Sequence, residues 1–244
     1  MGQAKNRVIK RATARSRALT VGRPAEDDGT RDRLKSAAMR LFSIHGIDGV
    51  TVRDIVTEAG ARNGASLHYY FRTKDDLIRE LVVDAAKRSD RARNIRLDRL
   101  EAHGGPKSVA DILRLIVEVE TIDKSDPDQG GPLPVGFGHM RFVVAMQFNH
   151  RKMFLDAIGE RWNKSYLRCI KHLRRLMSPI SASIVNQKLV FMALFLNTAL
   201  AAREAAFEDD PAGGKLWGQP VALENLVNTI AQGLESGWQD GRHQ

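Results

Sequence analysis

The sequence contains a single cysteine, Cys169, so no disulfide can form within the chain. A protein without disulfides fits a reducing compartment such as the cytoplasm. Because Cys169 falls within an apolar helical pattern, we expect its thiol to be buried and unreactive. Long hydrophobic runs are also missing, since the longest, 189–202, is shorter than the roughly 20 residues that a bilayer requires. The basic, polar N-terminus lacks the apolar segment of a signal peptide, so we expect a cytoplasmic protein with no membrane partner.

Sequence motifs of common enzymes are absent as well. The chain has no HExxH, no G-x-S-x-G and no P-loop. The histidines at 139, 150 and 172 lack metal-ligand spacing to cysteine or carboxylate residues, so we interpret them as polar surface residues. We therefore expect no catalytic residues, no metal and no cofactor, and a cytosolic helical enzyme is the least favoured alternative.

Acidic residues are absent from the first 23 positions, although the whole chain has 38 lysines and arginines against 29 aspartates and glutamates. Its formal charge of +9 favours a polyanionic partner, but such a charge serves solubility equally well. Segment 1–24 is predicted to be a disordered basic arm that either follows DNA phosphates or only solubilises the chain. The arginines at 88, 91, 93, 96 and 99 alternate with acidic residues, and we interpret them as a solvated helix face.

The most informative stretch is 51–74, TVRDIVTEAGARNGASLHYYFRTK. Thr51 with Asp54 three positions later is a variant capping box for a short helix. Apolar residues at i, i+3, i+4 and i+7 give that helix one buried face, and Gly60 supplies the left-handed residue that ends it. A second short helix follows the turn. Its apolar anchors are Leu67, Tyr70 and Phe71.

The outward positions of these two helices carry small and hydrogen-bonding side chains, which suits close approach to base edges and phosphates. A surface helical hairpin without a partner is the alternative. Thr73 and Asp76 then cap another helix, whose first residue, Lys74, lies where the helix dipole disfavours a cation. A bound phosphate would remove this conflict, but Asp75 and Asp76 could also neutralise the lysine.

Helical periodicity continues through the rest of the chain, so we predict an all-α protein of about nine helices. A linker over 24–29 precedes the first helix, which is predicted to begin at Thr30. A loop rich in proline and glycine covers 126–138. One long helix is predicted from about Lys152 to Leu176.

The last two predicted helices, near 183–207 and 220–236, have more apolar surface than one small bundle needs. Pairing of these helices between two copies of the chain would cover that surface. Two-fold symmetry would also supply two DNA-reading units.

From Thr30 to Leu77 the chain resembles the DNA-binding domain of the tetracycline-repressor (TetR) family of bacterial transcription regulators. The resemblance is carried by AAMRLFSIHGIDGVTVRDIVTEAGARNGASLHYYFRTKDDL, where the helix ending LF, T-V-R-D-I, the A-G turn, Y-Y-F and T-K-D-D-L occur in order. One departure is the turn 62–64, which is one residue longer than the commonest form of the family. This departure leaves open which of Arg62, Asn63 and Ala65 reaches a base.

The resemblance implies DNA contacts at the start of the second helix, around the turn, on the third helix and at the start of the fourth. Ser66 and His68 would lie on base edges or phosphates, while Tyr69 and Lys74 would hold the DNA backbone. The predicted DNA-binding residues are Thr51, Arg53, Arg62, Asn63, Ala65, Ser66, His68, Tyr69 and Lys74.

After the basic arm at 1–24, the resemblance implies a helix-turn-helix domain at 25–72 and a ligand-binding and dimerisation domain at 73–244. Aromatic and thioether side chains of the third part could line an apolar cavity, although such residues serve as readily in a plain core. The ligand-binding candidates are Phe137, Met140, Phe142, Met146, Trp162 and Tyr166.

Together these features predict a homodimeric regulator that binds double-stranded operator DNA. Its simplest action is that of a repressor, released from a palindromic operator by a small apolar or amphipathic effector. The alternative is a sequence-indifferent architectural DNA-binding protein, which the basic arm favours. That alternative leaves the large C-terminal bundle unexplained.

Overall fold

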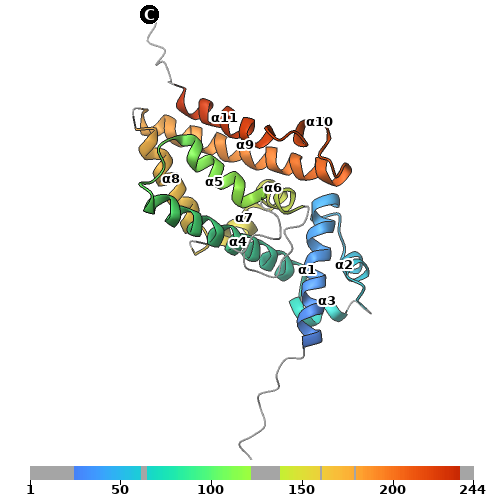
Figure 1. Cartoon of the computed structure of the whole chain (residues 1–244). Coiled ribbons are helices and arrows are strands. Elements are labelled where there is room, and N and C mark those ends of the chain that lie inside the picture. Colours follow the sequence, from blue (N-terminus) through green and yellow to red (C-terminus); the bar gives the residue numbers. More distant parts are fainter. Residues whose placement is uncertain (1–24, 62–64, 122–137, 160, 179, 237–244) are drawn as a thin grey trace, which may run out of the picture.

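The computed structural model describes residues 25–61, 65–121, 138–159, 161–178 and 180–236, all of them in helices or in the turns between helices (Figure 1). The prediction of an all-α protein is therefore confirmed for this part of the chain. A small head built on α1, α2 and α3 lies at one end of a larger helical body. The helices are α1 (Ala25–His45), α2 (Val52–Glu58), α3 (Ala65–Phe71), α4 (Lys74–Ala102), α5 (Val109–Thr121), α6 (His139–Asn149), α7 (Arg151–Ile158), α8 (Lys164–Leu176), α9 (Ala182–Asp209), α10 (Gly214–Trp217) and α11 (Ala222–Glu235).

The head has its own hydrophobic cluster, to which α1, α2, α3 and the first half of α4 all contribute. The predicted anchors Ile55 and Leu67 are fully buried in it. Burial of such a side chain contributes about 2 kcal/mol, and together these residues fix α2 against α3. Arg40 on α1 donates a hydrogen bond to Glu58 on α2 at 2.8 Å, and Lys35 pairs with Asp84 on α4 at 2.7 Å.

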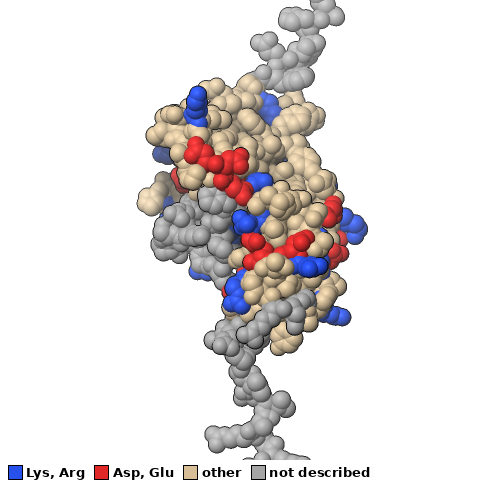
Figure 2. Space-filling view, turned by 90° about the vertical axis from the view of Figure 1, so that its right-hand side faces the viewer, with Lys and Arg blue, Asp and Glu red and all other residues tan. Residues whose placement is uncertain are grey.

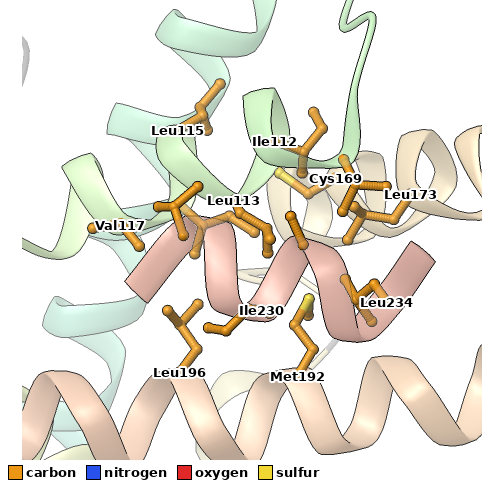
Figure 3. Packing of buried hydrophobic residues seen from close by; sticks show 14 of the residues in the cluster. Ile112, Leu113, Leu115, Val117, Cys169, Leu173, Met192, Leu196, Ile230 and Leu234 are labelled. Atoms are coloured by element: carbon orange, nitrogen blue, oxygen red, sulfur yellow. The ribbon is translucent and has the colours of Figure 1, made fainter. Parts of the chain in front are cut away.

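The body packs around a second cluster, in which α5 and α8 lie on one side of α11 and α9 lies on the other (Figure 3). Each of these four helices contributes buried residues to the cluster, among them Ile112 of α5, Cys169 of α8, Met192 of α9 and Ile230 of α11. Cys169 is buried, as predicted, and burial raises the pKa of its thiol to about 11.

Helix α9 is the only described helix long and apolar enough to cross a membrane by length and composition. One face of α9, including Leu189 and Leu196, is buried in the body core. Its opposite face leaves large apolar side chains in solvent. These side chains are Val190, Phe191, Leu194 and Phe195.

The structure departs from the predicted helices in three places. Helix α1 begins at Ala25, because AEDD after a proline is a favourable first helical turn and not a linker. The single helix predicted from Lys152 to Leu176 is instead divided into α7 and α8, since Gly159 takes φ +53°, a left-handed value incompatible with a continuing helix. The short α10 was not predicted. The last two differences account for the eleven helices of the described residues, where about nine were expected for the chain.

Helix α6 connects the head to the body. Its residues Phe142 and Met146 are buried in the head cluster, and the Phe142 ring stacks on Phe42 of α1 with centroids 6.1 Å apart. Met140, on another side of α6, belongs to the body cluster. A change in the position of α6 would therefore be felt in both units.

Candidate nucleic-acid interface and internal cavity

The start of α2 is fixed by the capping box that the sequence predicts. The Thr51 hydroxyl accepts a hydrogen bond from the backbone N–H of Asp54 at 3.2 Å, and the Thr51 N–H donates to the Asp54 carboxylate at 2.8 Å. These hydrogen bonds with Thr51 hold the pKa of Asp54 below its usual range. Thr51 and Arg53 are both exposed at this helix end, where an anion is favoured.

The turn after α2 begins as predicted, with Gly60 at φ +62°. Helix α3 then starts at Ala65. Arg62 and Asn63 lie outside the described residues, so their predicted contacts with bases stay predictions.

Helix α3 buries one face and exposes the other. Leu67 and Phe71 are buried in the head cluster. Ala65, His68 and Tyr69 are exposed, and Tyr69 has 72% of its surface in solvent. Ser66 is half-buried. The structure therefore brings these four predicted DNA contacts onto the short α3, where a double helix could approach them.

The His68 side chain is held by the junction between α3 and α4. Its Nδ1 lies 2.7 Å from the backbone oxygen of Arg72. Arg72 has φ +52°, an uncommon value for a residue with a side chain. This backbone conformation ends α3 and turns the chain into α4. It also leaves the Arg72 carbonyl within reach of the His68 side chain.

Lys74 has partners inside the head that its sequence position does not reveal. Its ammonium group donates to the backbone oxygens of Ile47 at 2.5 Å and Val50 at 2.6 Å, and it lies 5.5 Å from the centre of the Phe42 ring. Thr73 caps the same helix by accepting from the Asp76 N–H at 3.0 Å. Lys74 therefore ties α4 to the turn that precedes α2.

Surface charge on the face drawn in Figure 2 is mixed, with lysine and arginine interspersed among aspartate and glutamate. This face does not carry one continuous basic field over its described residues.

A cavity of about 340 Å³ opens in the body between α4, α5, α6, α7, α8 and α9. Three of the predicted ligand-binding residues, Met140, Trp162 and Tyr166, line it. Phe142 and Met146 do not, because they face the head cluster. Phe137 lies outside the described residues.

Sequence reasoning missed a buried polar cluster in the cavity wall. Glu120 accepts hydrogen bonds from Arg93 and Ser89, each at 3.1 Å, and lies 3.3 Å from His139 Nε2. Burial alone would raise the pKa of Glu120, but the hydrogen bond with His139 and the charge of Arg93 outweigh it and hold the pKa well below its usual range. Glu120 is therefore a buried carboxylate.

Two interpretations made from the sequence are corrected by this cluster. His139 is 5% exposed and is not a surface residue. The Arg93 side chain is 13% exposed and faces the body interior, not a solvated helix face. The signal that could have identified Arg93 is its spacing from Ser89, also on α4, because residues four apart share a helix face.

A capped helix-turn-helix head on a larger helical body, with a cavity between the helices of that body, is the architecture of a helical transcription regulator. Residues 34–81 match the sequence model of the bacterial regulatory proteins of the tetR family. The resemblance seen in the sequence is confirmed there, and the chain carries the N-terminal domain of the tetR family. No curated protein matches the chain in sequence.

Solved structures give the fold comparison. A chain from Shewanella sp. PV-4, provisionally assigned as a tetR family transcription regulator, shares 12% identity at a TM-score of 0.54. That match covers 83% of this chain and 96% of the other, so the two share the fold. A provisionally assigned transcriptional regulator from Rhodococcus sp. RHA1 has 22% identity over 84% of this chain and 95% of its own, with a TM-score of 0.33.

Proposed function

We propose that the protein is a homodimeric, sequence-specific DNA-binding regulator of transcription that responds to a small molecule. Its action is that of a cytoplasmic repressor, which leaves a palindromic operator when an apolar or amphipathic effector binds. The observation that carries the proposal is the exposed face of α3, fixed by the capped α2 on one side and the capped α4 on the other. In this proposal 25–72 reads DNA, 73–244 binds effector and dimerises, and the arm at 1–24 adds phosphate contacts.

Each proposed DNA-binding side chain is given a role that its hydrogen-bonding groups allow. The Arg53 guanidinium and the third N–H of the Lys74 ammonium suit phosphates, which only accept hydrogen bonds. Tyr69 supports the DNA backbone with its exposed hydroxyl. Ser66 and His68 lie where base edges would pass.

Dimerisation is assigned to α9 and α11, as the sequence predicts. The proposal is supported by the exposed apolar face of α9, which includes Phe191 and Phe195 at 64% and 51% exposure. A contiguous apolar patch of this kind marks an interaction surface. A two-fold axis there would place two heads on one DNA.

Effector binding is assigned to the body cavity. Its walls are mostly apolar, and they carry the Glu120–Arg93 pair at one place. An apolar wall with few polar groups fits a small amphipathic molecule. Because α6 contributes Met140 to the cavity and Phe142 to the head cluster, occupation of the cavity could shift the head through α6.

The test is a comparison of DNA sequences across a salt series. A duplex selected by the full chain from random DNA should bind at least roughly a thousandfold more tightly than its scrambled counterpart at physiological salt. Removing residues 1–23 should lower affinity for both duplexes and flatten the salt dependence. Equal affinities for the two duplexes at every salt concentration would instead support the architectural alternative.

A further inference from the structure

The hydrogen bond between His68 and Arg72 determines which His68 nitrogen carries a hydrogen. A backbone carbonyl can only accept, so at 2.7 Å from the Arg72 oxygen His68 Nδ1 must be the donor. In the neutral imidazole the other nitrogen, Nε2, then has a lone pair and no hydrogen. The exposed His68 side chain therefore offers DNA an acceptor.

The carbonyl that orients His68 is itself held in place. The Arg72 N–H donates back to the His68 carbonyl at 3.1 Å, so the two residues are joined twice. Phe71 before Arg72 is buried in the head cluster, and Thr73 after it is the capping residue of α4. The ring therefore keeps one orientation at little further entropic cost when DNA arrives.

An acceptor at this position discriminates between the two classes of DNA contact. Phosphate oxygens have no hydrogen to give, so a neutral His68 oriented in this way gains nothing from a phosphate. In the major groove the donors are the amino groups at adenine N6 and cytosine N4, whereas guanine and thymine present acceptors. The sequence leaves both base edges and phosphates open for His68, and this geometry separates them.

We propose that His68 is a specificity-determining residue that accepts a hydrogen bond at Nε2 from an exocyclic base amino group, with the Arg72 carbonyl as its positioning partner. This inference rests on the proposed DNA-reading function. Neighbouring side chains differ in chemistry: Arg53 has only donors, and the Tyr69 hydroxyl both donates and accepts. His68 supplies sequence preference, and these neighbours supply affinity.

The test removes single amino groups from the selected operator. In separate duplexes, each adenine is replaced by purine, which lacks the 6-amino group, and each cytosine by pyrimidin-2-one, which lacks the 4-amino group. One such change in each of the two half-sites should together weaken binding of the full wild-type chain by roughly ten- to a hundredfold, the effect of two hydrogen bonds, one for each protomer. On the intact operator, His68→Ala should bind more weakly than the wild type by the same factor. Removing the amino group from the operator should then weaken the binding of His68→Ala no further.

Two controls make the result specific. Tyr69→Phe should weaken binding to all sequences while remaining sensitive to the deleted amino group. The salt dependence of His68→Ala should match that of the wild type, because no phosphate contact is lost. Circular dichroism of His68→Ala should match the wild type, since the side chain is exposed.

Several results would overturn the assignment. If the logarithmic salt slope of His68→Ala were lower by about one, His68 would be a protonated phosphate ligand. If every amino deletion weakened DNA binding by His68→Ala as much as it weakens binding by the wild type, His68 would contact none of these amino groups. A wild-type chain that selects no operator would overturn the proposed function itself, which is a separate outcome from failure of this assignment.

Discussion

Lys74 donates a hydrogen bond to the backbone oxygen of Val50 at 2.6 Å, which places the first residue of α4 against the last residue before the Thr51 cap of α2. The same ammonium donates to Ile47. Two of its three hydrogens are thereby used inside the head, and the ammonium also lies over the Phe42 ring. Lys74 therefore has a structural role in addition to the DNA contact proposed for it.

Replacing Lys74 should affect both stability and DNA binding. Lys74→Met keeps the apolar stem near Phe42 but leaves the Ile47 and Val50 carbonyls without their donor, so the free energy of unfolding should fall by about 1–3 kcal/mol. Affinity should fall alike for specific and scrambled DNA. Urea unfolding and fluorescence anisotropy measure these changes.

Arg53→Met is the matched control for Lys74, because Arg53 is exposed at the start of α2. It should weaken DNA binding with a stability change within about 0.5 kcal/mol. A Lys74→Met protein as stable as the wild type would show that its hydrogen bonds to the turn contribute little.

Local sequence signals predicted the head well because its geometry is set by neighbouring residues. The Thr51–Asp54 box and the terminating Gly60 act within a few positions, and both formed as predicted. The division between α7 and α8 was missed because apolar spacing continued across Gly159. A glycine inside a helical pattern is often tolerated, so its left-handed conformation was not evident.

Relationships across long stretches of sequence could not be predicted in the same way. Arg93 and Glu120 are 27 residues apart and meet only because α4 packs beside α5. Apolar periodicity likewise could not tell that Met140 would face the cavity and Phe142 the head, because both faces of α6 are covered. Such assignments depend on the packing partner and not on residue type.

Filling the body cavity should weaken the binding of apolar molecules there. Ala193 on α9 lines the cavity, so the larger side chain of Ala193→Phe would occupy its space. Binding of the neutral apolar dye N-phenyl-1-naphthylamine, followed by its fluorescence, should weaken roughly tenfold or more, equivalent to at least about 1.4 kcal/mol.

The matched variant is Ala199→Phe, on the same helix and packed against the same core but outside the cavity wall. Either substitution costs about 1–3 kcal/mol of stability through overpacking. Only Ala193→Phe should bind the dye more weakly than the wild type. Equal loss in both variants would mean that the dye reports general loosening of the body.

Replacing the buried carboxylate should alter the dependence of stability on pH. Glu120→Gln leaves the buried Arg93 without its charge partner, so at pH 7 the free energy of unfolding should fall by about 3 kcal/mol. In the exposed Arg114–Glu224 pair, Glu224→Gln should cost less than about 1 kcal/mol. Urea titrations at a series of pH values measure both effects.

The sign of the pH effect follows from the lowered pKa of Glu120. Because the unfolded carboxylate takes up a proton first, at about pH 4.3, its contribution is fully present above that pH and declines below it. The wild type should therefore lose its advantage over Glu120→Gln as the pH falls below about 4.3. A difference that stayed constant down to pH 3 would contradict the lowered pKa.

The exposed face of α9 should control assembly. Phe191→Glu places a charge at a side chain that is 64% exposed in the single chain, so folding of each copy should change little. In a paired interface the same charge would be buried without a partner, at a cost of several kcal/mol. Sedimentation should show a dimer for the wild type and a monomer for Phe191→Glu at micromolar concentration. Affinity for a palindromic operator should then fall roughly a hundredfold, because the two heads would no longer be linked.

The control for this prediction is Leu167→Glu, which places the same charge at an apolar side chain on α8 with 55% exposure. Since α8 packs mainly against α4 and α5, this variant should remain dimeric and bind the operator like the wild type. A dimeric Phe191→Glu protein would show that α9 does not form the interface. Loss of the dimer in both variants would place the interface nearer α8, and the spacing of the two heads on DNA would then differ from that proposed for α9 and α11.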